Sequence, residues 1–434
     1  MQFRVKKPEA AGGAPSTDSA RSSSDASTPG RCSVLCLVAR VFRVRIARAF
    51  RGAERRPPAR RVAAVGLETS RAGGRRSARM VGWMIFAVLG AMPLKPALAA
   101  GAVMQAIHGE TMGTTWSVKY FPPTETNFSN ATARALVQAE LDRLEAQMSN
   151  YRADSVVSRF NAFAETNWFP VPIETARVVA EALEISRRTE GAFDITVAPL
   201  VRLWGFGPRR RTGVVPTDAA IAEALTRVGW RHLEVRGAAA STGASKNERG
   251  TANAGAALRK RIVGVEIDLG GIGKGFAAET VSELLRRRGV TNHLVGIGGD
   301  LQARGPGPTG NGWRVGIENP LAATNGLARV IALRDAALST SGNYRNFFTM
   351  NGKRYGHIVD PRTGRPVLAG VASVAVVAPR GTHADALATG LFVLGEKHAL
   401  HFAERDGVAV WLMLEGADGR AGERMSGVFE RLGE

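Results

Sequence analysis

The feature that most constrains this chain is a glycine-rich stretch, Asp268-Leu269-Gly270-Gly271-Ile272-Gly273-Lys274-Gly275, between two segments of opposite character. The β-branched run 262–267 before it is typical of a strand, and residues 276–285 after it have the apolar spacing of a helix. Glycine lets the backbone approach a ligand, and the first N–H groups of a helix have no partner inside that helix. The stretch therefore indicates an anion site, where the lysine adds a positive charge that reaches phosphate oxygens.

Two better-known phosphate loops do not match this stretch. The P-loop pattern needs a glycine five residues before Gly273 and a Ser or Thr after the lysine, but those positions hold Asp268 and Gly275. The dinucleotide fingerprint G-x-G-x-x-G fails because Gly271, Gly273 and Gly275 are spaced by two. From these residues alone, a tight strand-to-helix turn with a solvated lysine stays open beside the anion site.

The net charge of +20 belongs mainly to the N-terminal part of the chain. Residues 1–100 hold 19 of the 58 basic and only 5 of the 38 acidic side chains, so the body is close to neutral and nucleic-acid binding is not expected. Residues 1–79 are rich in Arg, Ser, Ala, Gly and Pro. We expect them to form a basic low-complexity tail that is disordered or not translated.

A secretory signal is predicted at residues 80–99. An apolar core follows Arg75, Arg76 and Arg79 and leads to Ala97-Leu98-Ala99-Ala100, which has the small-x-small spacing of a cleavage site. Both cysteines, Cys32 and Cys36, precede this segment, so the mature body has no thiol chemistry. These features predict a soluble periplasmic protein, with a membrane anchor formed by the uncleaved signal as the alternative.

The body combines several strand-like segments with a few helices, which predicts an α+β fold of mixed, largely antiparallel sheets flanked by helices. Helices are expected at 129–148, 174–189 and 382–394, the last ended by Gly395. Residues 237–260 are low in complexity and are expected to form a flexible hairpin insertion without function. The functional domain is predicted to span residues 105–415.

Asp385 and Thr389 are four residues apart in the last predicted helix and therefore share a face. A carboxylate and a hydroxyl are hard oxygen ligands that suit Mg²⁺ when phosphates and water fill its other positions. The alternative is an ordinary acidic residue near a helix start and a threonine facing solvent. Of the seven histidines, only His357 lies among dense polar and turn residues, three before Asp360, although a lone histidine is more often a surface residue.

Seven blocks of the body resemble, in the same order, those of the FAD:protein FMN transferases, the ApbE family. They cover nearly all of residues 105–415 and are Met112-Gly113-Thr114-Thr115, Ser149-Asn150-Tyr151 through Phe160-Asn161, Gly191-Ala192-Phe193-Asp194, the glycine-rich stretch 268–275, Gly298-Gly299-Asp300, His357-Ile358-Val359-Asp360-Pro361, and Ala384-Asp385-Ala386-Leu387-Ala388-Thr389.

The resemblance implies an ApbE-like fold, FAD as substrate, Mg²⁺ as cofactor, and transfer of FMN to a Thr or Ser hydroxyl of another protein with release of AMP. It implies an exported or membrane-bound redox protein as the acceptor, with association at the inner membrane as a further expectation. It also implies that Mg²⁺ is held by the Gly271 carbonyl, Asp385 and Thr389. The residues implied to contact FAD are Met112, Tyr151, Ala192, Phe193, Asp194, Asp268, Lys274, His357 and Ile358.

The residues themselves agree with these roles. The glycine turn and Lys274 suit a pyrophosphate, while aromatic side chains such as Tyr151 and Phe193 suit the flat rings, although aromatics more often belong to a core. His357 is the expected general base, and Asp360 is expected to orient it or share that task. Two other functions stay open, namely a pyrophosphatase that splits FAD into FMN and AMP, and a flavin-binding assembly factor without turnover.

Overall fold

The computed structural model describes residues 103–123, 128–208, 214–238, 255–322, 326–368, 370–416 and 421–432. All of them belong to one compact unit that spans residues 93–434. The predicted tail 1–79 and signal 80–99 lie outside the described residues, so both stay predictions. Among the described residues, no helix has both the length and the apolar character needed to cross a membrane.

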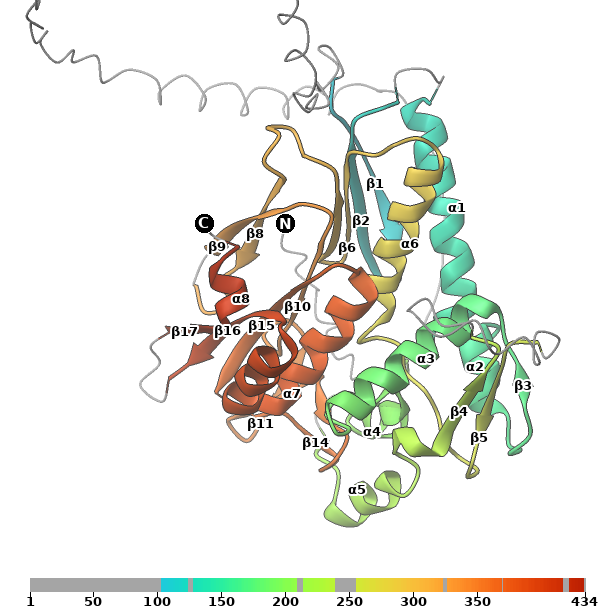
Figure 1. Cartoon of the computed structure of the whole chain (residues 1–434). Coiled ribbons are helices and arrows are strands. Elements are labelled where there is room, and N and C mark those ends of the chain that lie inside the picture. The colour runs from blue at the N-terminus through green and yellow to red at the C-terminus, as the bar shows by residue number, and fades with distance from the viewer. Residues whose placement is uncertain are drawn as a thin grey trace, which may run out of the picture. The chain divides into compact units, whose positions relative to one another are not determined.

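The centre of the unit is an eight-stranded sheet in which every neighbouring pair is antiparallel (Figure 1). This arrangement, with helices packed on the sheet, confirms the predicted α+β class with largely antiparallel sheets. In spatial order the strands are β1 (Gln105–Thr111), β2 (Thr114–Tyr120), β6 (His293–Ile297), β7 (Asp300–Arg304), β10 (Ala337–Ser341), β15 (Val371–Ala378), β16 (Ala409–Glu415) and β17 (Ala421–Met425).

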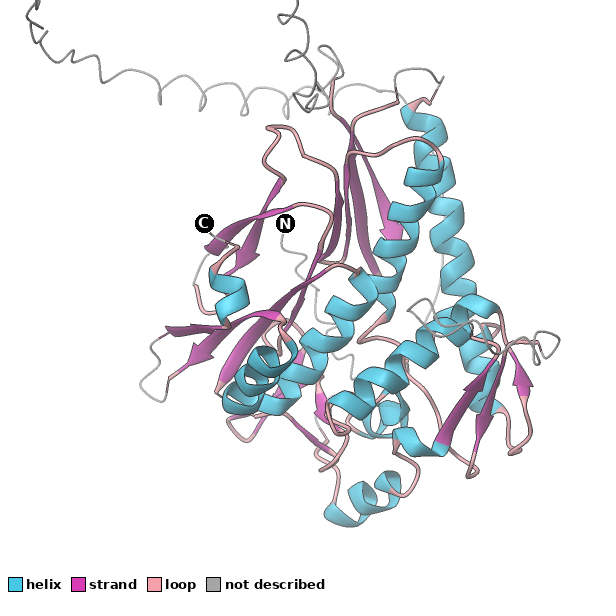
Figure 2. Ribbon diagram, viewed as in Figure 1, coloured by secondary structure: helices cyan, strands magenta, loops and turns pink. Residues whose placement is uncertain are grey.

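Side chains alternate between the two faces of the sheet along each strand, and apolar side chains are buried on both faces. In β15, Val374 and Val376 point into one hydrophobic core, while Ala375 and Val377 point into a second core on the opposite face. Helices α1 (Asn130–Met148), α6 (Gly273–Arg287) and α7 (Gly381–Asp406) cover the first face (Figure 2). The second face packs against strands β8 (Trp313–Glu318) and β9 (Leu327–Leu333) and helix α8 (Gly427–Glu430).

A smaller region beside the helices carries the remaining elements. It includes α2 (Val156–Ala162), α3 (Ile173–Arg188) and a three-stranded antiparallel sheet, β3 (Phe169–Pro170), β5 (Ala257–Lys260) and β4 (Leu233–Arg236). The other short elements are η1 (Ile195–Val197), α4 (Ala198–Leu203), α5 (Asp218–Leu225), η2 (Trp230–His232), β11 (Phe347–Met350), β12 (Lys353–Gly356), β13 (Val359–Asp360) and β14 (Arg365–Pro366). A third buried cluster joins α4 and α5 to the hairpin β11–β12.

The helix starts follow from local chemistry in the sequence. Ser129 and Ser155 each accept a hydrogen bond from the backbone N–H three residues later, so they cap α1 and α2. Helix α7 deviates at Gly395, whose φ of 75° and ψ of 173° are not helical, as expected for the predicted end. A second helical segment then continues to Asp406, which the sequence pattern did not predict.

Two expectations need correction. Residues 262–267 do not form a strand, because the backbone N–H and carbonyl of Ile267 pair with the side-chain amide of Asn161 at 2.8 and 2.9 Å instead of with a neighbouring strand. The insertion predicted at 237–260 is too long, because residues 257–260 are strand β5 and pair with β4. Residues 239–254 of that range lie outside the described residues.

Candidate active site

The first turns of α6 and α7 touch each other, and two glycines make this approach possible. A Cβ added to Gly275 would overlap the carbonyl oxygen of Gly381 and come within 2.6 Å of the Asp385 Cβ. At this contact the Gly275 N–H donates a hydrogen bond of 2.9 Å to Asp385 Oδ2. The close packing therefore places the Asp385 carboxylate against the start of α6, where the helix dipole favours negative charge.

Side chains from two other elements cap the start of α7. Gln302 on β7 accepts a 2.8 Å hydrogen bond from the Gly381 N–H, and Glu279 on α6 accepts hydrogen bonds from the N–H and hydroxyl of Thr382 at 3.2 and 2.5 Å. These bonds satisfy N–H groups that have no partner within the helix. They also fix the position of α7, and with it Asp385 and Thr389, relative to the central sheet.

Lys274 lies between two buried carboxylates. Its Nζ is 2.6 Å from Asp300 Oδ2 and 3.6 Å from Asp385 Oδ1. Burial opposes its charge, but the carboxylates of Asp300 and Asp385 together raise the pKa of Lys274. Burial and the neighbouring Asp300 raise the pKa of Asp385, and Lys274 opposes this effect. One ammonium for two buried carboxylates leaves an excess negative charge that a divalent cation would neutralise.

The three residues expected to hold the metal converge on one place. A Cβ added to Gly271 would lie 3.1 Å from Thr389 Oγ1, and Thr389 follows Asp385 by one turn of α7. Ser341 adds another hydroxyl, 3.1 Å from Thr389 Oγ1. Within the described ranges, no three His, Cys, Asp or Glu side chains form a metal-binding group. The residues present are instead a carboxylate, hydroxyls and a backbone carbonyl, which is a hard-oxygen set suited to Mg²⁺ shared with phosphates and water.

A pocket of about 390 Å³ opens beside this cluster. It gathers side chains from segments far apart in the sequence, including the loop after α3, the glycine-rich stretch, the loop after β12 and helix α7. The predicted site residues that line it are Tyr151, Ala192, Phe193, Asp194, Asp268, Gly271, Lys274, His357, Ile358, Asp385 and Thr389.

Two predicted site residues, Met112 and Asp360, are not among the residues that line this pocket. Met112 lies in the tight turn between β1 and β2, with a φ of 50°, and its N–H donates to Glu145. Asp360 accepts three hydrogen bonds of 2.9 Å from the backbone and side chain of Arg362. The carboxylate of Asp360 is therefore engaged with Arg362.

His357 is oriented by a backbone carbonyl. Its Nδ1 lies 3.2 Å from the carbonyl oxygen of Asn346, which only accepts hydrogen bonds, so Nδ1 carries the proton and Nε2 has the lone pair. Burial lowers the pKa of His357 and the charge of Lys274 lowers it further, against the effect of the Asn346 carbonyl. The ring is therefore mostly neutral at pH 7, in the tautomer that makes Nε2 a proton acceptor.

Two acidic residues of the pocket wall shape its loops. The carboxylate of Asp194 accepts hydrogen bonds from the N–H and hydroxyl of Thr196 at 2.8 and 2.7 Å and from the Trp230 N–H at 2.6 Å. Asp268 accepts a 2.8 Å bond from the Gly270 N–H, which tightens the glycine turn. Burial raises the pKa of both carboxyls. Both residues therefore hold the loops that carry positions expected to contact FAD.

Several pocket residues were not assigned a role from the sequence. Six of them come from the segment 340–346, which is the end of β10 and the loop before β11, and its polar character was visible but had no recognisable spacing. Asp300 was part of a family block, but its contact with Lys274 could not be read from the chain. The unassigned lining residues of this segment are Thr340, Ser341, Gly342, Tyr344, Arg345 and Asn346.

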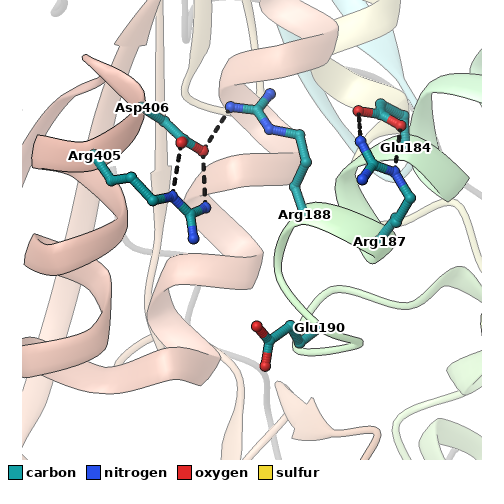
Figure 3. A pocket seen from close by; sticks show the side chains of 6 residues that line it. All are labelled: Glu184, Arg187, Arg188, Glu190, Arg405 and Asp406. Carbon is teal, nitrogen blue, oxygen red and sulfur yellow. Dashed lines mark hydrogen bonds and ion pairs between the residues drawn. The ribbon is translucent and has the colours of Figure 1, made fainter.

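A second, polar pocket lies away from the predicted residues, at the C-terminal ends of α3 and α7 (Figure 3). Arg188 and Arg405 both bind Asp406 there, at distances of 3.0 and 2.9 Å. Arg187 pairs with Glu184. The Arg188–Asp406 pair joins α3 to α7. We therefore assign this pocket a structural role and expect the chemistry in the pocket around Lys274.

Known proteins are similar to this chain in both sequence and fold. Residues 112–412 match the family model described as the ApbE family. The FAD:protein FMN transferase of Haemophilus influenzae is 38% identical over 332 residues, which are 76% of this chain and 91% of that protein. The protein of the same name from Escherichia coli (strain K12) is 35% identical over 324 residues, which are 75% of this chain and 88% of that protein.

Solved structures agree with these relatives. The flavin transferase ApbE from Vibrio cholerae superposes with a TM-score of 0.67 at 36% identity, covering 76% of this chain and 99% of that chain. The apo form of Pseudomonas stutzeri flavinyl transferase ApbE gives a TM-score of 0.67 at 34% identity, covering 76% of this chain and 97% of that one. The resemblance inferred from seven sequence blocks is confirmed, and the chain belongs to the ApbE family of flavin transferases.

Proposed function

We propose that this chain catalyses the Mg²⁺-dependent transfer of FMN from FAD to a Thr or Ser hydroxyl of an acceptor protein, with release of AMP. The curated relatives carry the name FAD:protein FMN transferase. The observation that carries the proposal is that one pocket brings together Lys274, the pair Asp385 and Thr389, and the proton-accepting histidine His357. Together these are a phosphate-binding charge, a set of metal ligands and a base.

FAD is expected to bind with its pyrophosphate beside the glycine turn at Gly271 and the ammonium of Lys274. The backbone at this turn allows a close approach, and Lys274 supplies positive charge at the start of α6. The flat rings are expected against Phe193 and Tyr151, which line the same pocket. Holding the reacting phosphorus in place is a large part of catalysis for such a displacement.

Mg²⁺ would be held by the Gly271 carbonyl and by the side chains of Asp385 and Thr389, with Ser341 beside Thr389. When bound, it neutralises charge on the pyrophosphate and so favours departure of the AMP phosphate. The protein contributes the fixed geometry of these ligands, because Asp385 Oδ2 is held by the Gly275 N–H and α7 is capped by Glu279 and Gln302.

The reaction is a displacement at the phosphorus of the FMN half. Nε2 of His357 accepts the proton of the acceptor hydroxyl, and the hydroxyl oxygen forms a bond to this phosphorus. The bond between this phosphorus and the bridging oxygen breaks, and AMP leaves with the electron pair. The proposal needs no covalent intermediate with the enzyme, since positioning and charge neutralisation supply most of the acceleration.

The test is a labelling reaction with purified protein, FAD, Mg²⁺ and a membrane-bound redox subunit as the acceptor. We expect a covalent fluorescent flavin band on the acceptor, and an equal molar amount of AMP, only when all components are present. AMP release that does not depend on the acceptor would show a pyrophosphatase instead. Flavin binding without AMP release would show a carrier or assembly factor.

We also propose that the enzyme works in the periplasm after export by the segment 80–99. The proposal rests on the sequence of that segment and on the cysteine-free body. N-terminal sequencing of the protein from a periplasmic fraction should give a start near residue 100. A start upstream of residue 80 in the membrane fraction would favour the anchored alternative.

A further inference from the structure

Asp300 is a buried carboxylate for which the proposed reaction has no use. Its side chain is only 3% exposed, and a carboxylate in such a place needs a partner. It opens strand β7 directly after a two-residue turn, Gly298 and Gly299, in which both φ angles are positive, at 57° and 108°. The turn fixes Asp300 opposite Ile297 and two residues after Gly298, which lines the pocket.

The same turn leaves room for the side chain of Lys274. A Cβ on Gly298 would lie 3.2 Å from Lys274 Cδ and 3.0 Å from the Thr114 side chain, so a larger residue there would press on the lysine stem. At the end of this stem, the Lys274 Nζ lies 2.6 Å from Asp300 Oδ2. The turn and strand β7 therefore hold Asp300 in place for its ion pair with Lys274.

The ammonium of Lys274 is shared unequally between two carboxylates. It is 2.6 Å from Asp300 but 3.6 Å from Asp385, although both carboxylates are almost fully buried. Asp385 has one oxygen, Oδ2, bound to the Gly275 N–H, while Oδ1 faces the ammonium. An ammonium in full contact with Oδ1 would compete with a metal ion for the same oxygen.

We propose that Asp300 is a positioning residue that retains Lys274 and thereby keeps Asp385 Oδ1 accessible to the divalent cation. This inference rests on the proposed function, because it assumes that Asp385 binds the metal. Among the described residues, the side-chain ion pair of Asp300 is with Lys274, and no hydrogen bond joins Asp300 to Gly271, Asp385 or Thr389. Asp300 acts through the position of Lys274, whose ammonium lies closer to Asp300 than to Asp385.

The proposal predicts a pattern across three variants. In Asp300→Asn the neutral amide no longer holds the ammonium, so Lys274 moves onto Asp385 and metal affinity falls about tenfold or more. In Lys274→Met the competitor is gone, so the metal binds at least as tightly as in the wild type. The double variant Asp300→Asn/Lys274→Met should therefore recover metal affinity lost in Asp300→Asn, whereas its FAD affinity stays low.

The experiment uses Mn²⁺ as a probe for the Mg²⁺ site, with free Mn²⁺ counted by electron paramagnetic resonance and FAD binding followed by flavin fluorescence. Circular dichroism and thermal unfolding check the fold of each variant. Glu234→Gln is the matched control, because it removes a carboxylate that pairs with two arginines on the small sheet and does not line the pocket. It should bind Mn²⁺ as the wild type does.

Recovery of Mn²⁺ binding in the double variant supports the proposal. Wild-type affinity in Asp300→Asn, or a double variant that binds no better than Asp300→Asn, overturns it. If Asp300→Asn fails to fold, Lys274→Met decides alone, since a loss of Mn²⁺ binding in that variant contradicts competition. Failure of the wild type to bind Mn²⁺ would instead refute the proposed metal site, so the two failures are distinguishable.

Discussion

Replacing His357 by glutamine should nearly abolish FMN transfer while the protein remains folded. Glutamine has a similar size and keeps a polar group in the pocket, but it accepts no proton near neutral pH. The wild-type ring is prepared for this task, because the Asn346 carbonyl fixes the proton on Nδ1 and burial lowers the pKa of the ring. The decrease should appear in the rate of FMN transfer measured at saturating FAD.

The structure sets the size and the pH dependence of this effect. A positioned general base typically contributes about 10²- to 10⁴-fold in rate, so His357→Gln should lose roughly that factor. Because the pKa of His357 lies below its ordinary value of 6.5, at least roughly three quarters of the rings are neutral at pH 7. The wild-type rate should therefore fall only as the pH drops below 6.5, where the ring gains a proton.

The assay follows covalent flavin on the acceptor by in-gel fluorescence over time, from about pH 5 to 8.5. His398→Gln is the matched control, since His398 is exposed on the second segment of α7 and does not line the pocket. The control should transfer within about twofold of wild type. A His357→Gln variant that keeps a third or more of the rate, or a wild-type rate that still climbs tenfold above pH 7, would refute the assignment.

Three further predictions concern stability and packing. Burial lowers the pKa of His293 from 6.5 to about 4, so the unfolded chain gains the extra proton at a higher pH than the folded chain does. The free energy of unfolding should therefore drop by up to roughly 3 kcal/mol as the pH falls from 6.5 toward 4. In urea titrations, His293→Gln should flatten this dependence on pH. Gly275→Ala should cost about 1–3 kcal/mol, measured by thermal unfolding, and weaken metal binding, because its Cβ overlaps Gly381; unchanged unfolding would contradict this packing. Asn161→Ala should cost about 1–3 kcal/mol in urea, because Ile267 loses both partners, and a change within experimental error would contradict that role.

The parts of the site that depend on local spacing were predictable from the sequence. Asp385 and Thr389 are four apart in a helix, so they share a face wherever the helix packs. The glycine-rich stretch predicted the start of a helix, and α6 begins at Gly273 within this stretch. The family blocks then brought distant residues together, and the pocket contains all of the predicted positions except Met112 and Asp360.

The parts that depend on distant partners were not predictable. The run 262–267 has the composition of a strand, but an amide from Asn161, 106 residues earlier, satisfies the backbone of Ile267. Likewise, Asp300 meets Lys274 because the order of β6 and β7 beside α6 brings them together. No periodic pattern in the sequence indicates such a contact between distant residues.

Nearness in the sequence also misled one assignment. Asp360 was expected to orient His357 because it follows three residues later. In the structure Arg362 engages the Asp360 carboxylate, and the backbone of Asn346 holds the histidine ring. The orienting group is a carbonyl, which every residue has, so the sequence contained no signal for it.

The central claim is that Gly271, Asp385 and Thr389 hold a divalent cation beside the FAD pyrophosphate. Calorimetric titration of Mg²⁺ into the FAD-saturated protein tests it most directly, with Asp385→Ala measured beside the wild type. We predict one Mg²⁺ bound per wild-type chain and a loss of about a hundredfold or more in affinity for the variant, since a carboxylate is its main charged ligand. Equal Mg²⁺ binding by both proteins would contradict the claim.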